Sequence, residues 1–144
     1  MRFLRRTARA ALVGLSTLAF TTACSDGTGT VELPGTYQLA AINDEPLPWL
    51  VSESSTETEE IVRGWVDLDE SGRFSDVTVY RISGPGIVPQ EDIEEFTGDY
   101  EMNGDEIIFY EDQGGTYTMA RNGNDISQTI TTTNGSSFTF RYTK

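Results

Sequence analysis

Apolar and polar residues alternate in short stretches from residue 33 to the end of the chain. Residues 95–102, for example, place aromatic side chains, glycine and methionine on one face and charged or threonine side chains on the other. Residues 137–143 alternate in the same way. A period of two is typical of β-strands with one buried face, and no long stretch has the helical period. We therefore predict strands at 35–43, 61–69, 73–82, 95–102, 106–111, 116–121, 126–132 and 137–143.

Turn-forming pairs separate these strands. Asn-Gly pairs at 103–104, 122–123 and 134–135, together with Ser71-Gly72, supply the positive φ angles of tight hairpin turns. Successive hairpins make an antiparallel meander, and eight strands of this length can close on themselves, which removes exposed sheet edges. We predict an all-β fold, an eight-stranded antiparallel up-and-down barrel. The alternative is a two-sheet β-sandwich, because periodicity alone does not separate the two.

The lengths of the connections differ between the two ends of the predicted barrel. Alternate connections of a meander lie at the same end, so the tight turns at 71–72, 103–104 and 122–123 share one end. The long connections, 44–60 and 83–94, share the other end. Long loops in compact domains are often functional. We therefore expect a barrel that is sealed at one end and has an open mouth at the other.

The first two dozen residues have a different pattern. Four arginines are followed by a mostly apolar run at 10–20 and then by the small residues 21–23, which is the order of a secretory signal peptide. The run is shorter than the ~18 to 20 residues of a membrane-spanning helix, so an uncleaved anchor is the weaker alternative. Cys24 follows as the only cysteine. It could be a free thiol, but a single unpaired cysteine is unusual in an exported protein.

Thr21-Thr22-Ala23-Cys24 resembles the lipobox of bacterial lipoproteins. The resemblance implies cleavage before Cys24, a lipid on its sulfur and usually an acylated amine. Several acyl chains hold a protein at a membrane more firmly than one. The lipobox resemblance also implies an exported protein that is lipid-anchored to the cell envelope. By the sorting pattern of that family, Ser25 after the cysteine favours the outer membrane if the cell has one. The predicted organisation is a signal peptide at 1–23, the lipidated cysteine and a flexible tether at 24–32, and one domain at 33–144.

Charge and composition exclude several functions. Four of the ten basic residues precede Cys24, whereas all 23 acidic residues follow it. So acidic a domain repels nucleic acid and anionic headgroups, and we expect no nucleic-acid partner. Histidine is absent and no second cysteine exists, which removes the commonest general base and common metal ligands. With no recognisable nucleophile–base pair, we assign no catalytic residue and predict a non-enzyme without a cofactor.

Two acidic features of the sequence could in principle bind a cation. Residues 67–72 match the first half of a calcium-binding EF-hand loop, but Thr78 stands where a bidentate Glu is needed, so we predict no metal site. Acidic runs at 53–60 and 91–95 fall in the two long connections. They could form a cation site or a rim for a basic partner, but we favour ordinary solvated loop charge, which is what most charge runs are.

The segment from Gly35 to Pro48, Gly-Thr-Tyr-Gln-Leu-Ala-Ala-Ile-Asn-Asp-Glu-Pro-Leu-Pro, resembles the opening of small bacterial lipocalin-like lipoproteins. The turn at 69–74, the Gly-x-Tyr strands and the Phe-Arg-Tyr near the end follow the same style. Asp44 replaces the usual Gly, and Tyr37 stands where lipocalins place a Trp. The resemblance implies a calycin-type barrel.

These observations support two hypotheses for function. The first is a binding module that holds a small apolar or amphipathic ligand at the long-loop end. The second is a filled barrel that contacts an unidentified envelope protein through the acidic loops. The two hypotheses differ in whether a cavity exists. Trp49 could also be an ordinary core residue that plugs the barrel, the interpretation that we favour for it. Candidate ligand contacts are Trp49, Leu50, Ile87 and Val88 at the mouth, with Tyr37 and Tyr100 inside.

Overall fold

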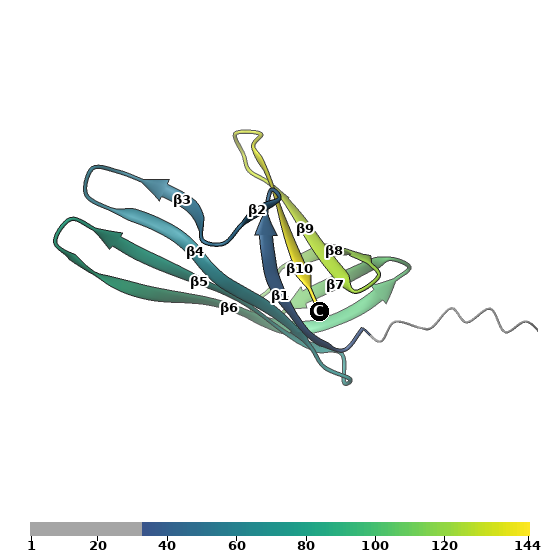
Figure 1. The fold of residues 1–144 in the computed structure, drawn as a ribbon. Coiled ribbons are helices and arrows are strands. Elements are labelled where there is room, and N and C mark those ends of the chain that lie inside the picture. The colour runs from purple at the N-terminus through teal and green to yellow at the C-terminus, as the bar shows by residue number, and fades with distance from the viewer. Residues whose placement is uncertain (1–32) are drawn as a thin grey trace, which may run out of the picture.

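The computed structural model describes residues 33–144, which form strands and turns (Figure 1). The predicted signal peptide, Cys24 and the tether lie outside the described residues. Within 33–144 no helix is long and apolar enough to cross a membrane. The strands are β1 (Gly35–Ile42), β2 (Glu45–Pro46), β3 (Trp49–Glu53), β4 (Thr58–Leu68), β5 (Arg73–Gly84), β6 (Ile87–Asn103), β7 (Glu106–Glu111), β8 (Thr116–Asn122), β9 (Asp125–Thr131) and β10 (Ser137–Thr143).

Eight of these strands close into a barrel. From β4 to β10 each strand pairs with the next in an antiparallel manner, and β10 pairs with β1. The first half of β1 also pairs with β4, with Gly35 opposite Leu68 and Gln38 opposite Trp65, and this ladder closes the sheet. The predicted eight-stranded up-and-down barrel is confirmed, and the sandwich alternative is wrong. The short strands β2 and β3 are additions to β1 and β4.

The predicted long connection at 83–94 is wrong. β5 and β6 continue as one hairpin up to a tight turn at Pro85-Gly86, where Gly86 has a φ of 78°. The acidic residues of this stretch lack an alternating pattern, but their backbones still pair with β5. The connection 44–60 likewise contains β2, β3 and the start of β4. The acidic runs therefore lie largely in strands and not in loops, which corrects their expected place.

The extended strands form an arm that projects from the barrel (Figure 1). It consists of β3, the first half of β4, the second half of β5 and the first half of β6. Two ion pairs cross it: Arg63 Nη2 lies 2.6 Å from Glu91, and Arg81 Nη2 lies 2.7 Å from Glu60. The two arginines thus offset part of the negative charge of the acidic runs.

One half of the barrel is filled by its own side chains. Tyr37, Ile107, Phe109, Met119 and Ile126 are fully buried there. The Phe109 ring stacks on Tyr117 at 4.7 Å between centroids and meets Phe74 edge-on at 4.9 Å. These strand ends carry the tight turns, so the predicted sealed end is a packed core.

The turn between β1 and β2 places two non-glycine residues at positive φ. Asn43 has a φ of 51° and Asp44 a φ of 63°, the pattern of a type I′ hairpin turn. The Asn43 amide donates to the Thr139 carbonyl at 2.8 Å, and its side-chain oxygen accepts from the Thr139 amide. This left-handed conformation favours glycine, which is the residue that the resembling lipoproteins have at the position of Asp44.

Replacing Asp44 by Gly should therefore stabilise the fold. We expect a gain of about 0.5 kcal/mol in the free energy of unfolding, since relief from the left-handed conformation outweighs the added chain entropy. Urea denaturation measures this difference. Asp105→Gly is the matched control, because Asp105 is an exposed turn residue without a positive φ and should show no gain. Equal effects of the two substitutions would contradict the explanation.

Candidate functional site

The barrel wall is incomplete between β8 and β9. These strands share three residue pairs, from Ala120 opposite Ser127 to Asn122 opposite Asp125. Beyond Ala120 the two strands are not paired with each other, although β8 pairs with β7 and β9 pairs with β10 along their lengths. The wall therefore opens toward the end of the barrel opposite the tight turns.

A pocket of about 440 Å³ lies at this opening. Side chains from the six consecutive strands β5 to β10 line it, and none of the lining residues is Arg or Lys. Thr78, Gln128, Thr129 and Ile130 complete the lining. The chemically distinctive residues are the carboxylates Asp76, Glu94 and Glu111 and the aromatics Tyr80, Phe96, Tyr117, Phe140 and Tyr142.

Asp76 is the buried charged residue of the described chain, with 8% of its surface exposed. The Tyr117 hydroxyl donates a hydrogen bond to Asp76 Oδ2 at 3.0 Å. Burial raises the pKa of Asp76 to about 6; the Tyr117 hydrogen bond opposes this rise, while the negative charges of Glu94 and Glu111 add to it. A buried carboxylate without a cationic partner is unfavourable for folding, and such groups gather at functional sites.

The pocket tyrosines stay neutral hydrogen-bond donors at physiological pH. Burial and the nearby charge of Asp76 raise the pKa of Tyr117 well above its ordinary value. Burial does the same to the pKa of Tyr142. The Tyr80 hydroxyl donates to Glu94 Oε2 at 3.1 Å, and burial raises the pKa of Tyr80 to about 12. The pocket thus combines hydroxyl donors, carboxylates and apolar rings.

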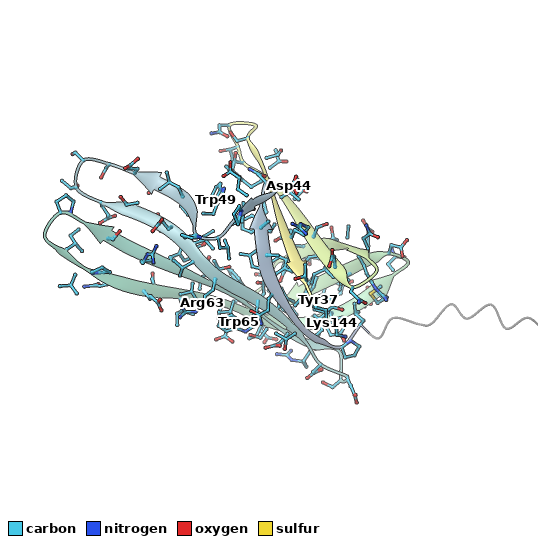
Figure 2. All side chains as sticks on the ribbon, viewed as in Figure 1. Tyr37, Asp44, Trp49, Arg63, Trp65 and Lys144 are labelled. Carbon is cyan, nitrogen blue, oxygen red and sulfur yellow. The ribbon has the colours of Figure 1, made fainter. Side chains whose placement is uncertain are left out.

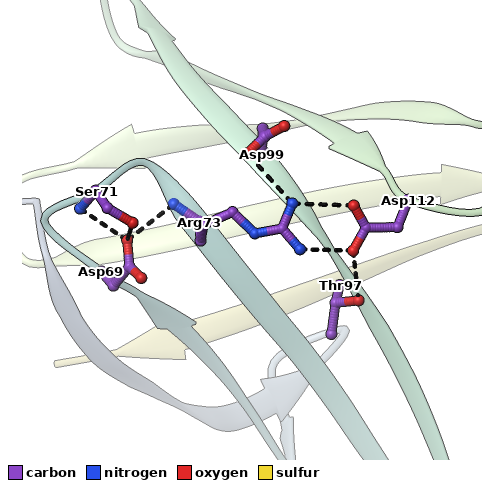
Figure 3. Close-up of polar contacts among 6 residues, drawn as sticks. All are labelled: Asp69, Ser71, Arg73, Thr97, Asp99 and Asp112. Carbon is purple, nitrogen blue, oxygen red and sulfur yellow. Dashed lines mark hydrogen bonds and ion pairs between the residues drawn. The ribbon is translucent and has the colours of Figure 1, made fainter.

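An ion-pair cluster ties the loop after β7 to the neighbouring strands (Figure 3). Arg73 donates to both carboxylate oxygens of Asp112, at 2.9 and 2.6 Å, and also contacts Asp99 at 3.3 Å. The Thr97 hydroxyl donates to Asp112 at 2.9 Å. These contacts hold the pKa of Asp112 below its ordinary value. Because Glu111 immediately precedes Asp112, the cluster fixes one side of the pocket.

The turn that resembles half of an EF-hand loop satisfies its own carboxylate. Asp69 Oδ1 accepts hydrogen bonds from the Ser71 and Arg73 amides at 2.8 and 2.9 Å and from the Ser71 hydroxyl at 2.7 Å (Figure 3). Asp69 therefore shapes the β4–β5 turn. In the part of the chain that the structure describes, no group of three acidic, histidine or cysteine residues could hold a metal ion.

Three residues predicted to contact a ligand lie within or beside the core. The Tyr37 hydroxyl donates to the Leu33 carbonyl at 2.7 Å, and its ring lies beneath Lys144 Nζ (Figure 2). The Tyr100 hydroxyl donates to the Asp69 carbonyl at the tight-turn end. Trp49 is half-buried where β3 begins, and its ring meets Phe138 edge-on at 5.4 Å.

The other three predicted contacts lie on the arm. Leu50 is 48% exposed on β3, and Val88 is 78% exposed on β6. Ile87 is half-buried at the tip of the β5–β6 hairpin. None of the six predicted ligand contacts lines the pocket at the β8–β9 opening. Their role in ligand binding stays a sequence-based prediction.

Sequence reasoning missed the residues that line the pocket, although one signal was present. In the alternating run of β5, Phe74, Asp76, Thr78 and Tyr80 share a face, and Phe74 is a core residue. An aspartate on the buried face of a strand is the position at which local pattern and solvation conflict. Such conflicts are expected at functional sites.

Removing the charge of Asp76 should stabilise the protein at neutral pH. The native pKa of about 6 exceeds the ordinary value of 3.8, so the native state binds the proton more tightly than the unfolded state does. The resulting stability is complete below pH 3.8 and is lost as the pH rises through about 6. Asp76→Asn, which keeps an acceptor for Tyr117, should raise the free energy of unfolding at pH 7.5 by about 2 kcal/mol.

Urea denaturation at pH 7.5 and pH 4 measures this effect. The advantage of Asp76→Asn should shrink toward zero at the lower pH. Asp105→Asn serves as the control, because that side chain is exposed and should change stability little at either pH. A destabilised Asp76→Asn variant at pH 7.5 would show that the carboxylate is a structural necessity.

Comparisons with known proteins identify no relative. No protein-family model matches the chain, and neither the curated proteins nor the solved structures yield a match. The closed eight-stranded barrel is consistent with the lipocalin-like fold that the opening segment resembles.

Proposed function

We propose that residues 33–144 form a binding module for a small amphipathic ligand, which enters between β8 and β9. The observation that carries this proposal is the pocket of about 440 Å³. Its volume falls within the range of about 300 to 1,000 Å³ that is usual for small-molecule sites. Aromatic walls with a few polar groups are also typical of such sites.

The lining divides by chemistry. Phe96, Phe140 and Ile130 offer apolar surface for the body of a ligand. Tyr117 and Tyr142 add rings whose hydroxyl groups can orient a polar end. This division favours a ligand with one apolar and one polar part over a purely apolar one. With no reacting group singled out, the proposal is binding without catalysis.

The location of the module is proposed from the sequence. In this proposal the chain is a lipocalin-like lipoprotein: it is exported, cleaved before Cys24 and anchored to the cell envelope by lipid on that cysteine. The acidic surface supports this arrangement, because it keeps a tethered domain away from anionic headgroups. Residues 25–32 then link the lipid to the barrel.

Replacing Cys24 by Ser tests the anchor. We expect the variant to leave the membrane fraction, since serine offers no sulfur for the lipid. Fractionation of cells that produce the full chain measures this, with the unmodified chain as the control. A Cys24→Ser protein that stays in the membrane fraction would contradict lipid anchoring.

A second candidate function is contact with a basic envelope protein through the arm. Exposed apolar side chains gather there, namely Leu50, Val51, Val88 and Ile93. The acidic runs of β4 and β6 lie on the same arm and would complement a basic surface. This candidate requires no ligand in the pocket.

Native mass spectrometry separates the two candidates. Residues 33–144 close around their own core, so the chain 25–144 can be purified gently without its lipid. The binding module predicts a discrete added mass, either after purification or after incubation with a lipid extract, that denaturation removes. A mass that remains that of the bare chain in both cases would contradict the binding module and favour the arm.

The pocket itself is tested by filling its entrance. Gln128 is a half-exposed lining residue on β9, so Gln128→Trp should reduce the bound fraction at least about tenfold by occupying the opening. Ser127→Trp, one position along the same strand and outside the lining, is the matched control and should leave binding unchanged. Equal binding by both variants would place the ligand elsewhere.

A further inference from the structure

The charges around the pocket do not balance. Asp76, Glu94 and Glu111 line it, and no lining residue is cationic. The two arginines of β5, the strand that carries Asp76, form ion pairs with other carboxylates: Arg73 pairs with Asp112 and Asp99, and Arg81 pairs with Glu60. The pocket therefore presents concentrated negative charge to whatever enters it.

Asp76 is the carboxylate of the pocket that a cation would contact most favourably. Its Oδ2 atom accepts from Tyr117, whereas no other residue of the described chain donates to Oδ1. The side chain is largely buried, and because no buried side-chain polar atom of the described residues lacks a hydrogen-bond partner, Oδ1 borders the open pocket. A carboxylate in this setting gains most from a cation placed against it. A neutral ligand could donate a hydrogen bond to it but would not offset its charge, and an anionic ligand would be repelled.

The rings that share the pocket define the kind of cation. Phe96, Phe140, Tyr117 and Tyr142 line it beside the carboxylates. The faces of aromatic rings attract organic ammonium groups, and the attraction grows when water is excluded. A compact metal ion would leave this aromatic surface uncovered, whereas an ammonium group with an apolar body would use both features.

We infer that the pocket binds an organic cation, an amine or quaternary ammonium group attached to an apolar body. The cationic group lies against Asp76, the negative charges of Glu94 and Glu111 add to the attraction, and the apolar body packs against Phe96 and Phe140. This inference rests on the proposed function and names the ligand class of the same pocket.

Three octyl probes of different charge test the inference. Octyltrimethylammonium, octyl glucoside and octanoate have the same chain length but carry a positive, a neutral and a negative head. Calorimetric titration of the chain 25–144 below the micellar concentrations compares their affinities. We expect octyltrimethylammonium to bind at least about tenfold more tightly than octyl glucoside, and octanoate to bind least.

Two variants assign the preference to the pocket. Asp76→Asn should remove most of the tenfold preference by weakening octyltrimethylammonium binding far more than octyl glucoside binding, because the pocket keeps its shape and loses one charge. Gln128→Trp should weaken all probes, and Ser127→Trp none. If Gln128→Trp leaves octyltrimethylammonium binding intact, the cation is held by the acidic outer surface and the inference is overturned.

The pH dependence gives an independent readout. The groups that face Asp76 are Glu94 on β6, Glu111 on β7, Tyr117 on β8 and Tyr142 on β10, together with Tyr80 on its own strand. Octyltrimethylammonium affinity should fall about tenfold from pH 7.5 to pH 5, as Asp76 takes up its proton. The fall should largely disappear in Asp76→Asn. An unchanged fall in this variant would overturn the assignment to Asp76.

Failure of the inference and failure of the proposed function look different. Equal affinities for octyltrimethylammonium and octyl glucoside, both weakened by Gln128→Trp, would keep the binding module and overturn the cation preference. Absence of binding by every probe, together with a bare mass after incubation with lipid extract, would overturn both.

Discussion

Closure of the sheet depends on β1, which pairs with β10 along one edge and with β4 along the other. The ladder from Gly35 to Gln38 turns an open meander into a barrel with an inside and an outside. Only the first half of β1 reaches β4, so the far half of β4 is free to pair with β3 and extend into the arm. One short ladder thus determines both the enclosed core and the projecting sheet.

A second short ladder, between β8 and β9, determines where the interior can be reached. At the tight-turn end, where this ladder lies, the barrel is packed with Phe109, Met119 and Ile126. Toward the other end, β8 and β9 are no longer paired with each other. Asp76 lies on the inward face of β5 beyond the packed half, where Tyr117 donates to Oδ2 and Oδ1 borders the open pocket. An uncharged residue there would make the barrel more stable, and this cost in stability supports the proposal that the carboxylate belongs to a binding site.

The period of two in the sequence was sufficient to predict the strands in which buried and exposed side chains alternate. The strands at 106–111 and 137–143 were predicted with the bounds that β7 and β10 have, and the Asn-Gly turns fell at their expected places. It failed at 87–94, because both faces of β6 are largely exposed there and backbone pairing with β5 imposes no pattern on the side chains. The site was missed for a different reason. Its lining residues are far apart in the sequence, and Asp76, Glu111 and Gln128 come together only when the sheet closes into a barrel.

The carbon-13 NMR signal of the Asp76 carboxylate, followed from pH 3 to pH 9, shows whether the pocket holds a largely buried carboxylate without a cationic partner. We predict a pKa of about 6 for Asp76 in the free protein, because the carboxylate is largely buried beside Glu94 and Glu111 without a cation. Saturation with octyltrimethylammonium should lower that pKa, since the bound cation favours the charged form. A pKa near 3.8 that the probe leaves unchanged would show a solvated carboxylate, and the pocket would not be the site described here.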